Sequence, residues 1–230
     1  MKRTTRREFI KKLITATGGA IGIAAIGSDF LVPSSAYAQD IKFPEANCGE
    51  KSTAQQKILI TYASQFGTTG EIAKAMGEAM CQEGAIIETK WIQNVIDLQS
   101  YDAVVIGSAI HYDGWMSEAE EFVKTNQNIL SKVPVAYFFS CLTLSKQNEK
   151  ARRKAQTYAD KIANLVPKVK PVLVGQFAGV LDYGKMSFLT RTFAKGIMKI
   201  MQVKEGDYRN WNAIQTWAKD VHYELSARRA

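Results

Sequence analysis

Three short, almost continuously apolar runs are the feature that most constrains the fold of this chain. They occupy residues 57–62, 103–108 and 134–139 and are rich in Ile, Val and aromatic residues. A strand with this pattern is buried on both faces, which is typical of a parallel sheet covered by helices. The runs therefore predict an α/β fold.

Helical spacing of apolar residues follows most of these runs, so the chain is expected to alternate strands and helices. In such parallel sheets, ligands bind at the carboxyl ends of the strands. Strands are expected at residues 57–62, 85–91, 103–108 and 134–139 and from residue 171, and helices at about 69–83, 116–130, 148–165, 186–202 and 211–227.

The start of the chain has the features of an export signal. Six basic side chains precede residue 13, a Gly-rich apolar stretch extends to about Val32, and residues 36–38 form an Ala-Tyr-Ala cleavage pattern. Residues 5–11, Thr-Arg-Arg-Glu-Phe-Ile-Lys, resemble the twin-arginine export motif. An uncleaved membrane anchor is the alternative, but Asp29 and four glycines make a poor permanent span.

These features divide the chain into three parts. We expect a twin-arginine signal peptide at residues 1–38, a linker at residues 39–56, which lack periodicity, and one domain at residues 57–230. The mature protein is then expected in the periplasm. The twin-arginine route carries folded proteins, so a cofactor can be bound before export.

The net charge of +8 is divided unevenly between these parts. Residues 1–38 hold six basic and two acidic side chains, so residues 39–230 keep 24 basic and 20 acidic ones, a net charge of +4. Half of the basic excess therefore belongs to the targeting signal, and we expect no nucleic-acid partner.

The three cysteines predict neither a disulfide framework nor a metal site, since there is no Cys-x-x-Cys and no Cys/His cluster. Cys48 falls in the expected linker, and Cys81 and Cys141 are expected to be buried small side chains. Outside the cytoplasm, an odd count leaves one thiol free or allows an intermolecular bridge.

The loop after the first strand, residues 63–70, has the composition of a phosphate site. It is rich in Gly, Ser and Thr and enters a helix, whose N-terminal N–H groups and dipole attract anions. Neither the Walker nor the dinucleotide glycine pattern is present, which favours a phosphate monoester held by neutral donors. Capping of the helix by Thr68 or Thr69 is the alternative interpretation.

Two further loops follow strands at the same expected edge of the sheet. Residues 108–115 contain aromatic side chains that can stack on a flat ring, and residues 140–145 form a polar loop that can reach the edge of the same ring. Together, the three loops predict a site for a planar ligand that carries a phosphate.

The residues of these loops resemble a known family. Residues 58–73 are similar to the flavodoxin signature at the FMN phosphate loop, and residues 104–112 resemble the second flavin loop of one branch, the menaquinone-dependent protoporphyrinogen oxidases. Shorter stretches at residues 121–123, 178–183 and 199–201 continue the resemblance, which covers nearly all of residues 57–225.

The resemblance implies a doubly wound, five-stranded parallel sheet in the order 2-1-3-4-5, with an extra C-terminal helix, and FMN as cofactor. It implies stacking by Tyr112 or Trp115, leaves His111 as either a flavin donor or a loop residue, and requires no catalytic acid or base. By position it assigns Ser64, Gln65, Phe66, Gly67, Thr68 and Thr69 to the phosphate; Ser108, Ala109, Ile110, His111, Tyr112, Gly114 and Trp115 to the isoalloxazine; and Ser140, Cys141, Leu142 and Thr143 to its far edge.

The implied activity is electron transfer or oxidoreduction, with a redox protein or the quinone pool as partner. The alternatives are a quinone-coupled dehydrogenase and a flavin-free binding module on the same fold. Residues 185–204 contain five basic and no acidic side chains among apolar ones. They predict either a helix that lies on an anionic membrane surface or a crossover helix docked on the sheet with a solvated basic face.

Overall fold

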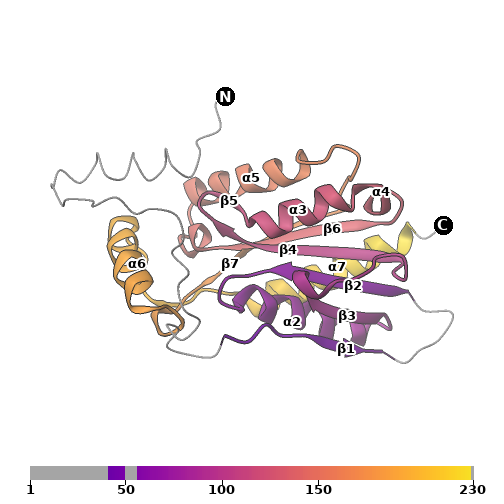
Figure 1. The fold of residues 1–230 in the computed structure, drawn as a ribbon, viewed down its shortest axis with the longest axis horizontal. Coiled ribbons are helices and arrows are strands. Elements are labelled where there is room, and N and C mark those ends of the chain that lie inside the picture. Colours follow the sequence, from indigo (N-terminus) through magenta and orange to yellow (C-terminus); the bar gives the residue numbers. More distant parts are fainter. Residues whose placement is uncertain (1–40, 50–55, 229–230) are drawn as a thin grey trace, which may run out of the picture. The chain divides into compact units, whose positions relative to one another are not determined.

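The computed structural model describes residues 41–49 and 56–228. The predicted signal peptide, residues 1–38, lies outside this range. The core of the described part is a sheet whose parallel strands are drawn edge to edge in Figure 1. Those strands are β2 (Lys57–Ala63), β3 (Ile86–Trp91), β4 (Ala103–His111), β6 (Val135–Cys141) and β7 (Val174–Ala178).

The order of these strands in space is β3-β2-β4-β6-β7, with every neighbouring pair parallel. Numbered along the chain, this is the order 2-1-3-4-5, so the predicted flavodoxin-like sheet is confirmed. The two extra strands, β1 (Ala46–Cys48) and β5 (Gly114–Trp115), pair antiparallel with β3 and β4.

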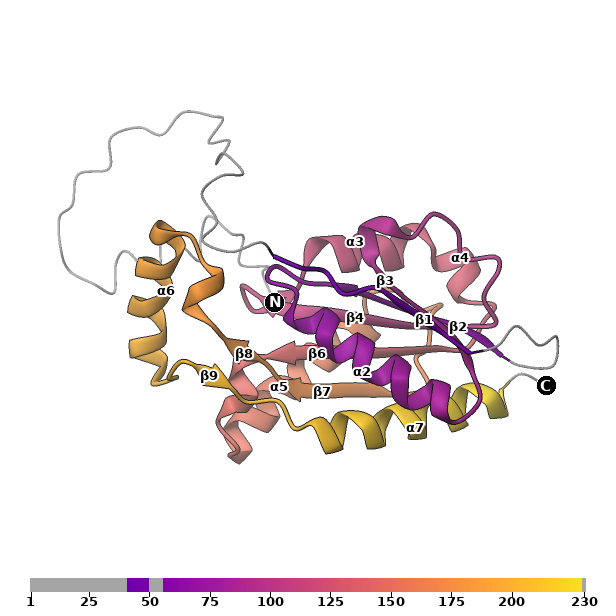
Figure 2. The ribbon, with the colours of Figure 1, turned by 90° about the horizontal axis from the view of Figure 1, so that it is seen from below.

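Helices cover both faces of the sheet (Figures 1 and 2). Helices α2 (Thr68–Gln82) and α7 (Trp211–Ala227) pack on one face, with Ile58 and Ile60 of β2. Helices α3 (Ser117–Thr125), α4 (Gln127–Leu130) and α5 (Glu149–Ala163) pack on the other, with Leu59. Each buried aliphatic side chain of this kind contributes about 1.5–3 kcal/mol, which explains why the strands are apolar throughout.

Two expected segments differ in the structure. The helix expected at residues 116–130 is divided at Asn126, whose side-chain amide donates to the Phe122 carbonyl oxygen over 2.9 Å at the end of α3. The expected linker contains β1, which pairs with β3 and ends at Cys48.

Cys48 forms a disulfide with Cys81 of α2. Cys81 lies on a helix as expected but is only partly buried, so its interpretation as a buried side chain is wrong, and Cys141 is the remaining free cysteine, buried as expected. This disulfide could not be predicted from the sequence, because Cys48 lies in a segment without periodicity, 33 residues before Cys81.

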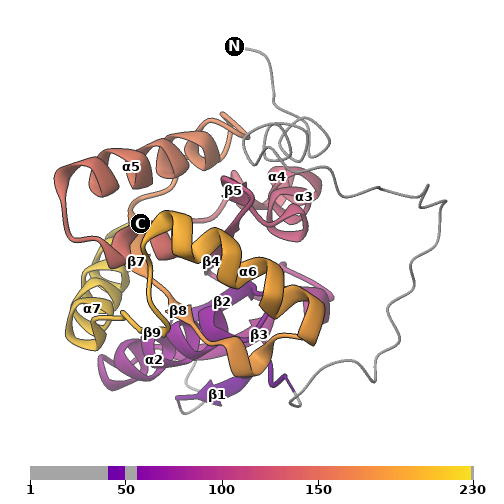
Figure 3. The same cartoon turned by 90° about the vertical axis from the view of Figure 1, so that its left-hand side faces the viewer.

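Residues 180–207 leave the sheet between β7 and α7 and form what we call the α6 lobe. Strands β8 (Val180–Leu181) and β9 (Gly206–Asp207) pair at its base, and helix α6 (Phe188–Met201) lies between them in the chain. Figure 3 shows α6 across the end of the sheet. The base of the lobe packs against two of the predicted loops, through the side chains of Phe66 and Leu142.

Helix α6 has no buried residue. Phe188, Leu189, Phe193 and Ile200 are all exposed. The partly buried Ala194 and Met198 of α6 pack against the buried cluster of Leu181, Met186 and Val203, so the helix docks on the base of the lobe. Within the described ranges, no helix combines the length and hydropathy needed to cross a bilayer.

Candidate functional site

The three predicted loops leave neighbouring strands at the carboxyl edge of the sheet. Ala63 at the end of β2 pairs with Ser108 of β4, and Ala109 pairs with Ser140 of β6. Neighbouring strands lie about 4.8 Å apart, so the loops start side by side. The first and third loops are also joined directly, because the buried hydroxyls of Thr69 and Ser140 lie 2.9 Å apart.

The first loop enters α2 at Gly67, the N-cap residue, which has a φ of 77°. No side chain of the described chain caps this helix end, so the capping interpretation of Thr68 or Thr69 is wrong. The Ser64 side chain is 5% exposed, and its hydroxyl has no partner among the described residues. An unpaired buried hydroxyl costs about 1–3 kcal/mol, so this loop presents a donor and a helix N-terminus suited to an anion.

Residues 41–45, expected as linker, form the outer wall of the first loop. A Cβ added to Gly67 would lie 2.1 Å from the Lys42 carbonyl oxygen, which shows how closely the two backbones approach. The Tyr62 hydroxyl donates to the Pro44 carbonyl oxygen over 2.9 Å and holds this segment in place.

The second loop is a tight hairpin from β4 to β5. Tyr112 and Asp113 form its tip, with φ of 47° and 68°. The Tyr158 hydroxyl donates to Asp113 Oδ1 over 3.0 Å, and Lys154 Nζ lies 2.6 Å from the same oxygen. Burial alone would raise the pKa of Asp113, but these two contacts lower it, so the carboxylate stays charged and fixes the hairpin to α5.

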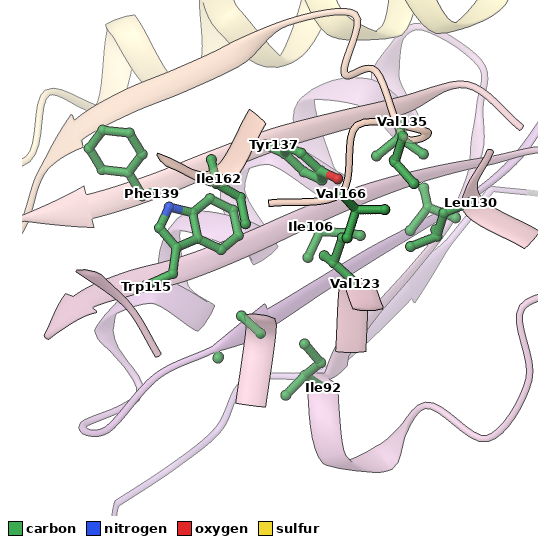
Figure 4. Packing of buried hydrophobic residues seen from close by; sticks show 14 of the residues in the cluster. Ile92, Ile106, Trp115, Val123, Leu130, Val135, Tyr137, Phe139, Ile162 and Val166 are labelled. Carbon is green, nitrogen blue, oxygen red and sulfur yellow. The ribbon is translucent and has the colours of Figure 1, made fainter. Parts of the chain in front are cut away.

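This hairpin separates the two predicted stacking residues. Tyr112 is 53% exposed at the tip, beside the His111 ring, whereas Trp115 is 6% exposed and packs edge-on against Tyr137 (Figure 4). The burial of Trp115 makes it the less suitable of the two candidates for stacking. It is a core residue, and Tyr112 stays the candidate.

The other predicted site residues differ in how deeply they are buried. Gln65 is exposed, while Phe66, Thr68, Ala109, Ile110, Gly114, Leu142 and Thr143 are partly buried. The Ser108 hydroxyl is used within its own loop, accepting from the Met116 amide over 2.9 Å and donating to the Ala109 carbonyl oxygen. Burial raises the pKa of the Cys141 thiol, which stays protonated.

Charged side chains that the sequence analysis did not assign to the site gather at the N-terminus of α2. Arg209 Nη1 lies 2.7 Å from Glu71 Oε2 and donates to the Thr68 carbonyl oxygen over 3.3 Å. Arg209 Nη2 lies 2.6 Å from Asp207 Oδ2, and Lys185 Nζ lies 3.4 Å from Glu71 Oε1. Arg209 and Glu71 are 138 residues apart, so no local pattern connects them.

Comparison with known proteins agrees with this arrangement. A family model described as "Flavodoxin domain" matches residues 59–208. The chain is 28% identical over 172 residues to protoporphyrinogen IX dehydrogenase (quinone) of Escherichia coli strain K12, covering 72% of this chain and 94% of that protein. It is 29% identical over 177 residues to the protein of the same name from Leishmania major, covering 71% and 74%.

Among solved structures, an archaeal flavodoxin aligns with a TM-score of 0.46 and 13% identity, covering 74% of this chain and 99% of that chain. The family model spans more than half of this chain, and its match takes in nearly all of the five parallel strands and all three loops. This chain therefore belongs to the flavodoxin domain family.

Proposed function

We propose that this chain is an exported FMN protein that acts in electron transfer. The cofactor is FMN, in keeping with the family. The observation that carries the proposal is the buried, unpartnered hydroxyl of Ser64 in the loop that enters the uncapped N-terminus of α2. The unpartnered hydroxyl and the N-terminus of α2 are the donors that a phosphate monoester needs, so the residues present fit it.

The chain's own groups would bind and orient the cofactor. Ser64, Thr68 and the backbone amides of residues 65–69 would hold the phosphate. Tyr112 would cover one face of the isoalloxazine, and residues 142–143 would line its edge. Bound FMN supplies hydride or single-electron transfer, so no acid or base is required of the protein.

A titration tests this assignment. The purified protein, stripped of flavin, is expected to take up one FMN per chain, seen as quenching of the flavin fluorescence, and to be reduced and reoxidised reversibly. A protein that is colourless as purified and takes up no FMN would overturn the proposal in favour of a flavin-free binding module.

A quinone-coupled dehydrogenase is the second candidate. It is favoured by the identity to proteins named protoporphyrinogen IX dehydrogenase (quinone). The same flavin-loaded sample separates the two candidates, because a dehydrogenase is reoxidised by a quinone at a rate that rises with quinone concentration. A carrier passes its electrons to a redox protein instead.

We also propose that α6 lies on an anionic membrane surface. Its outward side chains include Leu189, Phe193 and Ile200, all exposed. Lys195 and Lys199 are also exposed, and Lys195 Nζ lies 5.3 Å from the centroid of the Tyr183 ring. Residues 185–204 contain no acidic side chain. An exposed apolar strip with a basic border is the pattern of a helix that lies in a bilayer interface.

Export by the twin-arginine route is the third part of the proposal. It rests on residues 5–11 and the cleavage pattern at residues 36–38. The Cys48–Cys81 disulfide supports it independently, because disulfides persist in oxidising compartments such as the periplasm.

Cell fractionation tests export and membrane docking together. The full chain is expected on the outer side of the inner membrane and to be released by high salt, which screens exposed charges. Arg6→Lys/Arg7→Lys is expected to stay in the cytoplasm. Lys195→Glu/Lys199→Glu is expected to be exported but to leave the membrane, with binding reduced at least about tenfold, since each basic residue contributes about 1 kcal/mol at an anionic surface.

The matched control is Lys150→Glu/Arg152→Glu on the exposed side of α5, which makes the same change in charge. This variant should fractionate like the wild type. A wild-type protein that stays soluble after export contradicts docking through α6. A wild-type protein that stays on the membrane at high salt indicates an uncleaved anchor.

A further inference from the structure

Glu71 occupies an unfavourable place for a carboxylate in a phosphate site. It lies in the first turn of α2, the helix whose N-terminus faces the proposed phosphate. A negative side chain there interacts favourably with the helix dipole, but it repels a phosphate dianion. Two cations, Arg209 and Lys185, pair with Glu71 in the described structure.

The guanidinium of Arg209 is fixed in one position. Its side chain is 7% exposed and lies over the Trp211 ring, 4.3 Å from the ring centroid. Asp207 accepts from both Nε and Nη2, over 2.9 and 2.6 Å. The remaining nitrogen, Nη1, therefore points to Glu71 and to the Thr68 carbonyl oxygen.

We propose that Arg209 is a positioning residue for the FMN phosphate. It neutralises Glu71 and fixes the Thr68 carbonyl, so that the N–H groups of the first turn of α2 face the phosphate without a competing negative charge. The inference rests on the proposed FMN site. Because Arg209 acts on the phosphate alone, its loss should affect FMN but not riboflavin, which has the same ring and no phosphate.

The test is a titration of the full-length protein with FMN and with riboflavin, for Arg209→Gln and for Glu71→Gln. Arg209→Gln is expected to weaken FMN binding about tenfold or more, since charge-assisted contacts contribute roughly 1.5–3 kcal/mol, and to leave riboflavin binding within about twofold. Glu71→Gln is expected to strengthen FMN binding only. Glu71→Gln/Arg209→Gln should recover most of the lost FMN affinity.

The control Arg153→Gln removes a positive charge from an exposed ion pair on α5 and should change neither affinity. Equal losses for FMN and riboflavin in Arg209→Gln, or no recovery in the double variant, would overturn the role of Arg209 while the FMN assignment stands. Should Arg209→Gln not fold, Glu71→Gln/Arg209→Gln decides the matter, since removing both partners of a pair disturbs the fold less, and an FMN affinity far below that of the wild type in this variant contradicts the proposal. A wild type that binds neither flavin removes the FMN assignment and this inference together.

Discussion

Gly67→Ala is expected to lower the affinity for FMN about a hundredfold. The φ of 77° at this position costs an L-residue roughly 1–3 kcal/mol. The added Cβ would also lie 2.1 Å from the Lys42 carbonyl oxygen, so the loop or the 41–45 segment must move. A displaced loop no longer aims the Ser64 hydroxyl and the N-terminus of α2 at one phosphate. Fluorescence titration with FMN measures the loss.

Gly84→Ala is the matched control for this substitution. Gly84 follows the other end of α2, also has a positive φ, and has no atom within 4 Å of an added Cβ. It should lose some stability through backbone strain but keep its FMN affinity. Wild-type FMN affinity in Gly67→Ala would show that the cradle does not depend on this close approach.

Loss of the Cys48–Cys81 disulfide is expected to lower the free energy of unfolding by about 2–4 kcal/mol. The bridge closes a loop with a sequence separation of 33 residues, which restricts the unfolded chain. It also ties β1 to α2. Urea unfolding of Cys48→Ala/Cys81→Ala, followed by circular dichroism, measures the change.

Reduction provides the control for this experiment. A reductant should destabilise the wild type by the same amount and leave the double variant unchanged, because Cys141 forms no bridge. Equal midpoints for oxidised and reduced wild type would mean that the bridge does not contribute to stability.

The sheet could be predicted from the sequence because its determinants are local. Residues 57–62 bury both faces of a strand, so the run itself carries the information. The first loop could be predicted equally well, because Gly, Ser and Thr just before a helix are a local signal for an anion site. The end of β4 was harder, because the Asp113-Gly114 pair is displaced by one residue from the turn, which instead places Tyr112 and Asp113 at positive φ.

Two of the missed features depend on contacts with residues elsewhere in the chain. The direction in which Trp115 points is set by the antiparallel pairing of β5, which turns the indole onto Tyr137. The position of Arg209 is set by β9 and α7, and its partners Glu71 and Thr68 lie in another part of the chain. No spacing rule predicts a contact of this kind, and tertiary packing decides it.

Strand β1 affects how readily copies of this protein associate through the edges of their sheets. It pairs antiparallel with three residues of β3 and so occupies the edge of the sheet next to that strand. An open edge offers unpaired N–H and C=O groups to strands of other molecules, which is a route to aggregation. Because Cys48, the last residue of β1, is bonded covalently to α2, the edge stays occupied in the oxidised protein. The bridge therefore keeps this side of the sheet ending on a three-residue strand, and so short an edge offers few groups for pairing with another molecule.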